Sequence, residues 1–252
     1  MFNRIIFNLI NRMLAVMGLH ARLLNMPKTL VNDVPHTLLA AGASYAPWLN
    51  DQEFLRAYQK IKSFTLVDIY RCWELWSLIG QLTHLPGDVL EIGVWRGGTA
   101  CLIASKMLHS QMSCTCYLAD TFTGVVKAST QDTRYQNGEH SDTSVSLVIR
   151  LIESMNLQKN TKIIEGIFPD ESASSLATDE FKFCHIDVDT YASTKGCFEW
   201  IWPRLIVGGI VVFDDFGFQG CEGCTRFVNT LQMENMRMIY NLNGHAVIIK
   251  VP

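Results

Sequence analysis

LEIGVWRGGTA, residues 90–100, decides the fold, because an apolar run ends there in a glycine-rich turn and a segment with helical spacing follows. Glycines let the backbone turn tightly and bring the main chain close to a ligand. Three residues separate Gly93 from Gly97-Gly98, which differs from the G-x-G-x-x-G spacing of dinucleotide sites. The stretch therefore predicts a strand, turn and helix that bind a nucleotide-like cofactor. Its glycine spacing disfavours a dinucleotide.

Beyond Pro86-Gly87, short apolar runs alternate with segments of helical spacing. This alternation is typical of a parallel sheet covered by helices on both faces. We predict strands at Asp88–Val94, Thr115–Ala119, Lys162–Glu165, Lys182–Val188 and Gly209–Phe213. We predict helices at Thr99–Leu108, Ser141–Met155, shortly after Asp170, at Ser193–Trp202 and roughly at Gly223–Asn235.

The end of the chain has a different pattern. Two apolar runs, Arg237–Tyr240 and His245–Val251, flank Asn241-Leu242-Asn243-Gly244, which is a hairpin signal. A parallel sheet that ends in an antiparallel hairpin is the class I methyltransferase variant of the Rossmann-like fold, whereas the dehydrogenase variant lacks the hairpin. We therefore expect an α/β fold with a seven-stranded, mostly parallel sheet.

The first third of the chain is expected to be mostly helical over residues 1–80, with one helix at Phe64–Leu82. We assign residues 1–82 to a helical extension that caps the protein or dimerises and does not fold independently. Residues 83–252 form the methyltransferase domain in this interpretation.

The first 24 residues have an amphipathic helical pattern. Its apolar stripe consists of Ile6, Ile10, Met13 and Met17. The stripe could pack into the core, into a partner subunit, giving a homodimer, or onto a membrane surface, and the pattern leaves all three open. Polar residues from Asn8 onward interrupt it too early for a signal peptide or a transmembrane segment.

Charge and cysteine usage exclude several classes of function. The formal net charge is -3 and no run of like charges occurs, so we expect no nucleic-acid partner. The eight cysteines lie largely in apolar runs without a secretory signal, which predicts reduced thiols and a cytoplasmic location. Cys221 and Cys224 have zinc-ligand spacing, but no second pair accompanies them, so we expect a turn into a helix.

The expected cofactor contacts lie where the first three predicted strands end. Glu91 could reach the ammonium of a methionine moiety, unless it only caps structure, and Asp120 could accept hydrogen bonds from ribose hydroxyls. Glu165 and Gly166 follow the third strand, near the expected adenine. The full predicted set for S-adenosylmethionine is Glu91, Gly93, Val94, Trp95, Gly97, Thr99, Asp120, Thr121, Phe122, Glu165, Gly166 and Asp187.

Three carboxylates, those of Asp187, Asp214 and Asp215, follow two further strands that should be neighbours. Three such oxygen ligands suit an octahedral cation, Mg²⁺ before Ca²⁺. Asp189 should lie one step further from the metal. A metal that chelates two adjacent substrate oxygens lowers the pKa of the attacking hydroxyl, and Asp187 could then act as general base. The predicted reaction is methyl transfer from a sulfonium to oxygen.

Other polar and aromatic residues receive weaker assignments. His185 lies on a buried strand, so we interpret it as a core histidine. His140, in the polar loop 129–141, could reach the substrate, and this loop is either a mobile lid or a plain surface loop. The aromatic residues near the acids could wall the acceptor pocket or pack in the core. These residues are Tyr191, Phe216 and Phe218.

At four motifs the chain resembles the macrocin O-methyltransferase family of class I, S-adenosylmethionine-dependent methyltransferases. The motifs are GDVLEIGVWRGGT, YLADTFTG, HIDVDTYAST and GGIVVFDDFG, in order, within roughly residues 65–235. The resemblance implies methylation of sugar hydroxyls on natural products, dependence on Mg²⁺ and a dimer. It also implies that Asp187, Asp214 and Asp215 bind the metal. Val188 and Phe216 depart from the residues common in that family without removing a ligand.

The sequence leaves alternatives to a sugar O-methyltransferase. A catechol or phenol acceptor would chelate the metal in the same way, so the acceptor is a sugar diol or a catechol-like compound. A hydride-transferring oxidoreductase of the NAD type is opposed by the glycine spacing and the terminal hairpin. A cofactor-binding protein without catalysis is opposed by the three intact acids.

Overall fold

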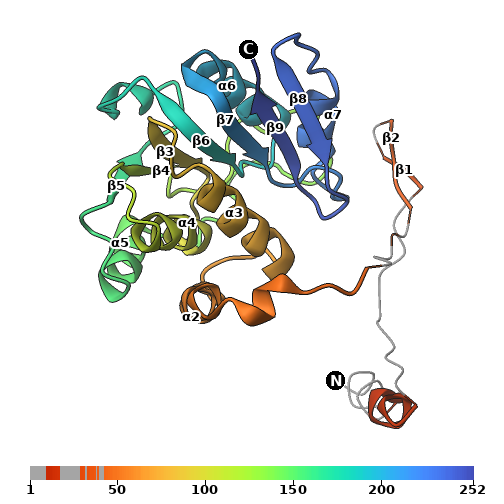
Figure 1. Ribbon diagram of the computed structural model, residues 1–252. Helices are drawn as coiled ribbons and strands as arrows, with labels where there is room; N and C mark the ends of the chain where they lie inside the picture. The colour runs from red at the N-terminus through yellow and green to blue at the C-terminus, as the bar shows by residue number, and fades with distance from the viewer. Residues whose placement is uncertain (1–9, 18–28, 32, 38, 40–42) are drawn as a thin grey trace.

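The computed structural model describes residues 10–17, 29–31, 33–37, 39 and 43–252. Within them, a seven-stranded sheet has the order β5-β4-β3-β6-β7-β9-β8 (Figure 1). Its parallel strands are β3 (Asp88–Ile92), β4 (Cys116–Asp120), β5 (Thr161–Glu165), β6 (Phe181–Ile186) and β7 (Leu205–Phe213). The hairpin of β8 (Met236–Tyr240) and β9 (Ala246–Lys250) pairs antiparallel with β7 through β9. The predicted Rossmann-like class I methyltransferase fold is confirmed.

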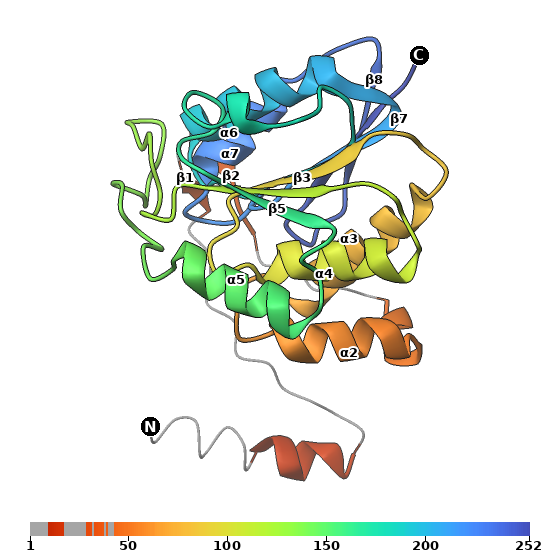
Figure 2. The same ribbon diagram turned by 90° about the vertical axis from the view of Figure 1, so that its left-hand side faces the viewer.

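Helices cover both faces of the sheet, as Figure 2 shows. One face carries α2 (Gln52–Ile61), α3 (Ile69–Gln81), α4 (Gly98–His109) and α5 (Val145–Ser154), and the other carries α6 (Tyr191–Ile201) and α7 (Glu222–Asn229). Phe54 of α2 and Leu75 of α3 are fully buried in the same core cluster as Leu102 of α4. Helices α2 and α3 thus share the core of the sheet, while the domain boundary after residue 82 stays a prediction.

Several predicted element ends shift in the structure. Helix α3 begins at Ile69 rather than Phe64, because the Asp68 carboxylate caps it by accepting from the Tyr70 and Arg71 backbone N–H groups. Helix α5 begins after Ser144, whose hydroxyl accepts from Leu147 N. Strand β7 begins four residues early, at Leu205, because Leu205 pairs with Phe181. Short 3₁₀ turns occupy Pro47–Asn50, Ala173–Ser175 and Trp202–Arg204.

Two short strands that the sequence did not predict lie in the first third of the chain, whose described residues are otherwise mostly helical. Strands β1 (Leu30–Val31) and β2 (Val34–Pro35) form an antiparallel hairpin. Val34 is buried, and the ring Nε2 of His36 lies 3.4 Å from the buried carboxylate of Glu222 at the start of α7. Strands of two residues have no hydrophobic period, so the sequence could not reveal them.

The amphipathic N-terminal segment is helical at residues 10–15. Ile10, Met13 and Met17 are exposed, so core packing is wrong for this described part, and Ile6 lies outside the described residues. Contacts with a partner or a membrane surface stay predictions. None of the helices in the described residues has the length and apolar character needed to cross a membrane.

Candidate active site

A cavity of about 300 Å³ lies beyond the carboxyl ends of the parallel strands. Ligands of open α/β sheets bind at this edge, since the loops after the strands converge there. The predicted residues that line the cavity are Gly93, Val94, Trp95, Thr99, Asp120, Thr121, Gly166, Asp187, Asp214 and Asp215. Cofactor and metal candidates from five strand ends thus face one space.

The glycine turn after β3 depends on close backbone approach. Gly93 has φ +89°, and a Cβ at this position would lie 1.7 Å from the carbonyl oxygen of Asp187. Gly97 caps α4 with φ +87°, and Gly98 N donates to Phe64 O at 3.1 Å. The turn is therefore packed directly against the strand end that carries Asp187.

Gly93→Ala should destabilise the protein by more than about 4 kcal/mol, because the clash with Asp187 O adds to the cost of a left-handed backbone. Gly138→Ala is the matched control: Gly138 has φ +91° but nothing within 4 Å of an added Cβ. That variant should lose only the backbone term of about 1–2 kcal/mol. Denaturant unfolding measures both, and equal losses would contradict the close approach.

Asp120 holds the turn from the neighbouring strand. Its Oδ2 accepts from Val94 N and Trp95 N, both at 2.7 Å, and its Oδ1 accepts from Phe122 N at 2.6 Å. Burial raises the pKa of Asp120, and these backbone hydrogen bonds oppose the rise. These bonds occupy three of about four carboxylate acceptor sites, which leaves one for a bond from a ligand.

Glu91 lies behind the cavity wall. It is fully buried, and its Oε1 accepts from Thr99 Oγ1 at 2.5 Å and lies 3.1 Å from His185 Nδ1. Thr99 lines the cavity and Glu91 does not. Glu91 Oε2 is a buried atom without a hydrogen-bond partner among the described residues. Its predicted contact with a cofactor ammonium stays a prediction. The core assignment of His185 agrees with its complete burial.

Three other predicted cofactor residues lie outside the cavity lining. A Cβ at Gly97 would meet the side chain of Val148, so Gly97 faces α5. Phe122 packs in the hydrophobic core, and Glu165 is exposed at the end of β5. The cofactor contacts of Gly97, Phe122 and Glu165 stay predictions.

Asp187, Asp214 and Asp215 each offer a carboxylate oxygen within 4.8 Å of the others. Burial, followed by the charges of Asp214 and Asp215, raises the pKa of Asp187 well above its usual value. Burial and the charges of Asp189 and Asp214 do the same for Asp215. A divalent cation would offset this repulsion, so the donor set fits a hard metal ion.

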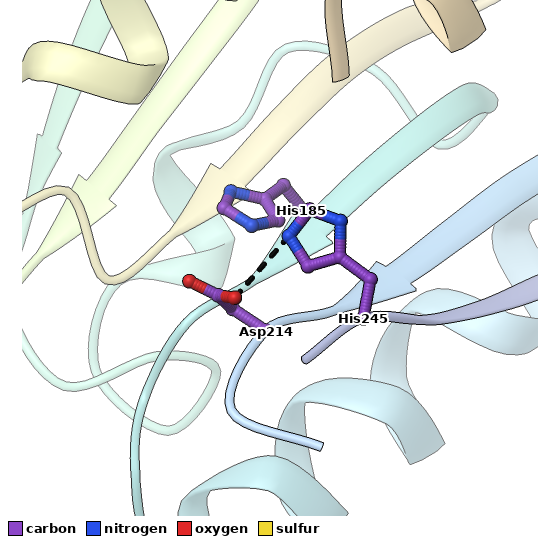
Figure 3. A group of neighbouring side chains, drawn as sticks. All are labelled: His185, Asp214 and His245. Carbon is purple, nitrogen blue, oxygen red and sulfur yellow. Dashed lines mark ion pairs between the residues drawn. The ribbon is translucent and has the colours of Figure 1, made fainter. Parts of the chain in front are cut away.

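Two side chains from distant parts of the sequence contact the Asp214 carboxylate. Its Oδ1 receives the guanidinium Nη1 of Arg71 and lies 3.2 Å from His245 Nε2 (Figure 3). Burial alone would raise the pKa of Asp214, but Arg71 and His245 lower it below its usual range. Burial lowers the pKa of His245, but its contacts with Asp214 and Glu74 raise it by more, so the net shift is upward.

Two other donor groups exist among the described residues: His185, Asp214 and His245, and Asp189, Asp215 and Cys221. In the first group, the Arg71 cation already contacts Asp214 Oδ1. This group has a single carboxylate, so a metal there would meet the repulsion of Arg71 without the two further acids that accompany Asp214 at the Asp187, Asp214 and Asp215 group. Cys221 immediately precedes α7, as expected for a turn into a helix, and no donor group in the described chain joins it with Cys224.

The loop 129–141 closes one side of the cavity and is anchored. Asp132 Oδ1 accepts from Tyr191 N at 2.8 Å, and the Thr133 hydroxyl donates to the buried Glu222 carboxylate. Arg134, Tyr135 and His140 line the cavity. Whether the loop moves as a lid stays a prediction.

The expected aromatic wall is formed in part. Phe218 lines the cavity, whereas Tyr191 and Phe216 do not, since both pack in the core cluster on the α6 and α7 side. The segment just before α3 and the first turn of α3 also line the cavity, which the sequence did not predict; these residues are Phe64, Thr65, Leu66, Val67 and Arg71. Asp68 is a helix-capping residue type and could have indicated where the helix starts, but no sequence pattern placed that helix start over the site.

Comparison with known proteins agrees with this architecture. The profile of the macrocin O-methyltransferase family (TylF) matches residues 62–244. Mycinamicin III 3''-O-methyltransferase of Micromonospora griseorubida is 30% identical over 150 residues, which cover 55% of this chain and 58% of that protein. The 8-demethyl-8-(2,3-dimethoxy-alpha-L-rhamnosyl)-tetracenomycin-C 4'-O-methyltransferase of Streptomyces olivaceus is 26% identical over 147 residues, 55% of this chain and 56% of that protein.

Among solved structures, the O-methyltransferase NovP matches with a TM-score of 0.67 and 21% identity, covering 75% of this chain and 83% of that one. This likeness concerns the fold. The chain spans less than two thirds of the length of the curated relatives it matches.

Proposed function

The chain belongs to the macrocin O-methyltransferase family, and on this premise we propose that it methylates a hydroxyl of a sugar on a glycosylated natural product. The methyl donor in this proposal is S-adenosylmethionine. One observation carries it: the carboxylates of Asp187, Asp214 and Asp215 meet on the cavity that the Gly93 turn also lines. Family membership leaves the NAD-type alternative without support.

The residues proposed to hold Mg²⁺ are Asp187, Asp214 and Asp215. Their converging oxygens and the raised pKa values of Asp187 and Asp215 support this assignment. When bound, the metal ion would lower the pKa of a chelated acceptor hydroxyl and balance the carboxylate charges. Asp189, which also lines the cavity, is proposed to lie beyond the ligands.

Asp187 is proposed to be the general base. When bound, S-adenosylmethionine would supply an electrophilic sulfonium methyl group. Asp187 would take the proton of the acceptor hydroxyl as its oxygen bonds to that methyl carbon and the S–CH₃ bond breaks, with S-adenosylhomocysteine as the other product. A positioned base contributes about 10²- to 10⁴-fold, and alignment of the two reactants adds more.

The sugar acceptor is supported by the cavity and by the relatives. The cavity lining combines carboxylates and Arg71 with the rings of Tyr135 and Phe218, a mixture that suits a polyhydroxyl ring with an apolar face. The Streptomyces olivaceus relative is named for a rhamnosyl compound. The proposal includes a homodimer and a cytoplasmic location.

Methyl transfer is tested with labelled S-adenosylmethionine, Mg²⁺ and a panel of rhamnosyl glycosides and catechols. We expect S-adenosylhomocysteine and a monomethylated glycoside in equal amounts. Methylation of catechols alone would replace the sugar with the phenol alternative. Absence of both transfer and S-adenosylhomocysteine binding would overturn the methyltransferase proposal.

A further inference from the structure

A buried polar chain connects the C-terminal hairpin to the candidate metal site. His245 directly precedes β9 and is fully buried. Its Nδ1 lies 2.7 Å from Glu74 Oε2 on α3, and its Nε2 lies 3.2 Å from Asp214 Oδ1 (Figure 3). The imidazole therefore bridges two carboxylates that come from distant parts of the sequence.

Glu74 is itself fixed by the hairpin turn. Its carboxylate accepts from the side-chain amides of Asn241 and Asn243, the latter at 2.9 Å. Asn243 Oδ1 in turn accepts from His245 N at 2.9 Å. These bonds hold both the ring and its carboxylate partner, so the direction in which Nε2 points is determined.

The same oxygen of Asp214 is held from a second side. Arg71 Nη1 also contacts Oδ1, and Arg71 Nε binds Asp68 Oδ2 at 3.0 Å. The described contacts of the Asp214 carboxylate thus involve Oδ1. The two contacts hold Oδ1 in place, so Oδ2 is the oxygen that faces another partner.

We propose that His245, oriented by Glu74, is a positioning residue that presents Asp214 Oδ2 to the divalent cation. This inference rests on the proposed function, because it takes Asp214 as a metal ligand. Partners that orient a ligand without touching the metal typically change metal affinity by about 10- to 100-fold when they are lost. The hairpin that distinguishes this sheet would then also tune the metal site.

The test is calorimetric titration of the full chain with Mg²⁺. His245→Leu should weaken Mg²⁺ binding by about 10- to 100-fold. His245→Gln, which keeps a donor toward Asp214, should restore part of the affinity. Glu74→Gln should weaken binding less than the leucine variant, because Asp214 keeps both of its partners.

His109→Leu is the matched control, since His109 is half exposed at the end of α4. It should bind Mg²⁺ like the wild type. S-adenosylhomocysteine titration should be the same for all variants, which shows that each one folds. Thermal unfolding without metal gives a second check on folding.

The outcomes separate this inference from the proposed function. If the wild type binds no Mg²⁺, the metal site of the proposed function fails. If the wild type binds Mg²⁺ and Asp215→Asn does not, but His245→Leu binds as tightly as the wild type, only the positioning role is overturned. Loss in His245→Leu of Zn²⁺ binding, with Mg²⁺ binding intact, would also overturn it in favour of a separate His185–Asp214–His245 site.

Discussion

Asp187→Asn should reduce methyl-transfer turnover by about 10²- to 10⁴-fold at saturating cofactor and Mg²⁺. The asparagine keeps the size of the side chain but cannot take the hydroxyl proton. The backbone carbonyl of Asp187 packs against the Gly93 turn and its carboxylate lies with those of Asp214 and Asp215, an arrangement that neither of these two acids shares. Steady-state and single-turnover rates, measured with an unmethylated acceptor that the wild type methylates, report the effect.

Stability provides the control for this variant. The pKa of Asp187 is raised by burial and by neighbouring acids. An acid with a raised folded pKa disfavours folding once the pH exceeds its unfolded pKa of about 3.9. A neutral asparagine should therefore leave thermal stability near pH 7 unchanged or higher. The matched control is Asp179→Asn, because the Asp179 side chain is 87% exposed and does not line the cavity. This variant should leave turnover intact. Full turnover in Asp187→Asn would rule out the base assignment.

Asp215→Asn should weaken Mg²⁺ binding by at least about 100-fold, because it removes one of three proposed charged ligands. Asparagine tolerates the left-handed backbone at this position, where φ is +61°. Removal of the charge also relieves repulsion from Asp189 and Asp214, so the fold should persist. Titrations with Mg²⁺ and with S-adenosylhomocysteine measure the two sites separately.

Asp189→Asn is the matched control for Asp215→Asn. Asp189 also lines the cavity, has φ +64° and has a pKa raised by burial. Loss of the Asp189 charge should weaken Mg²⁺ binding less than loss of the Asp215 charge. Equal losses in the two variants, with a further loss in Cys221→Ala, would instead place the metal between Asp189, Asp215 and Cys221.

Asp214 is a less suitable variant for this purpose. It is almost fully buried beside Arg71, so its removal leaves a buried cation without its partner. Breaking a buried ion pair in this way costs about 3–5 kcal/mol. A lost titration signal in such a variant would mix metal binding with unfolding.

Local pattern was sufficient for the sheet. Each parallel strand is a short apolar run between turn signals, and Asn241–Gly244 marked the terminal hairpin. The same patterns placed Gly93, Asp120 and Asp187 at strand ends, and in a parallel sheet strand ends meet at one edge. The three carboxylates were therefore predictable as a group before any coordinates.

Contacts between distant segments were not predictable in the same way. Arg71 and Glu74 lie on a helix whose sequence looks like ordinary core packing, and His245 follows a hairpin turn. The pattern predicted that Glu91 contacts the cofactor, but in the fold its carboxylate is buried and accepts a hydrogen bond from Thr99. Likewise, the two-residue strands β1 and β2 have too few residues to carry a period.

The amino-acid sequence by itself determined the fold class, the glycine turn after β3 and the carboxylate trio, because periodicity and glycine placement act over a few residues. Only the tertiary structure decided which side chains surround that trio. Arg71 from α3 and His245 from the hairpin meet at Asp214 across 143 and 31 positions of sequence. Such meetings depend on how whole helices and strands pack, and no local pattern records them.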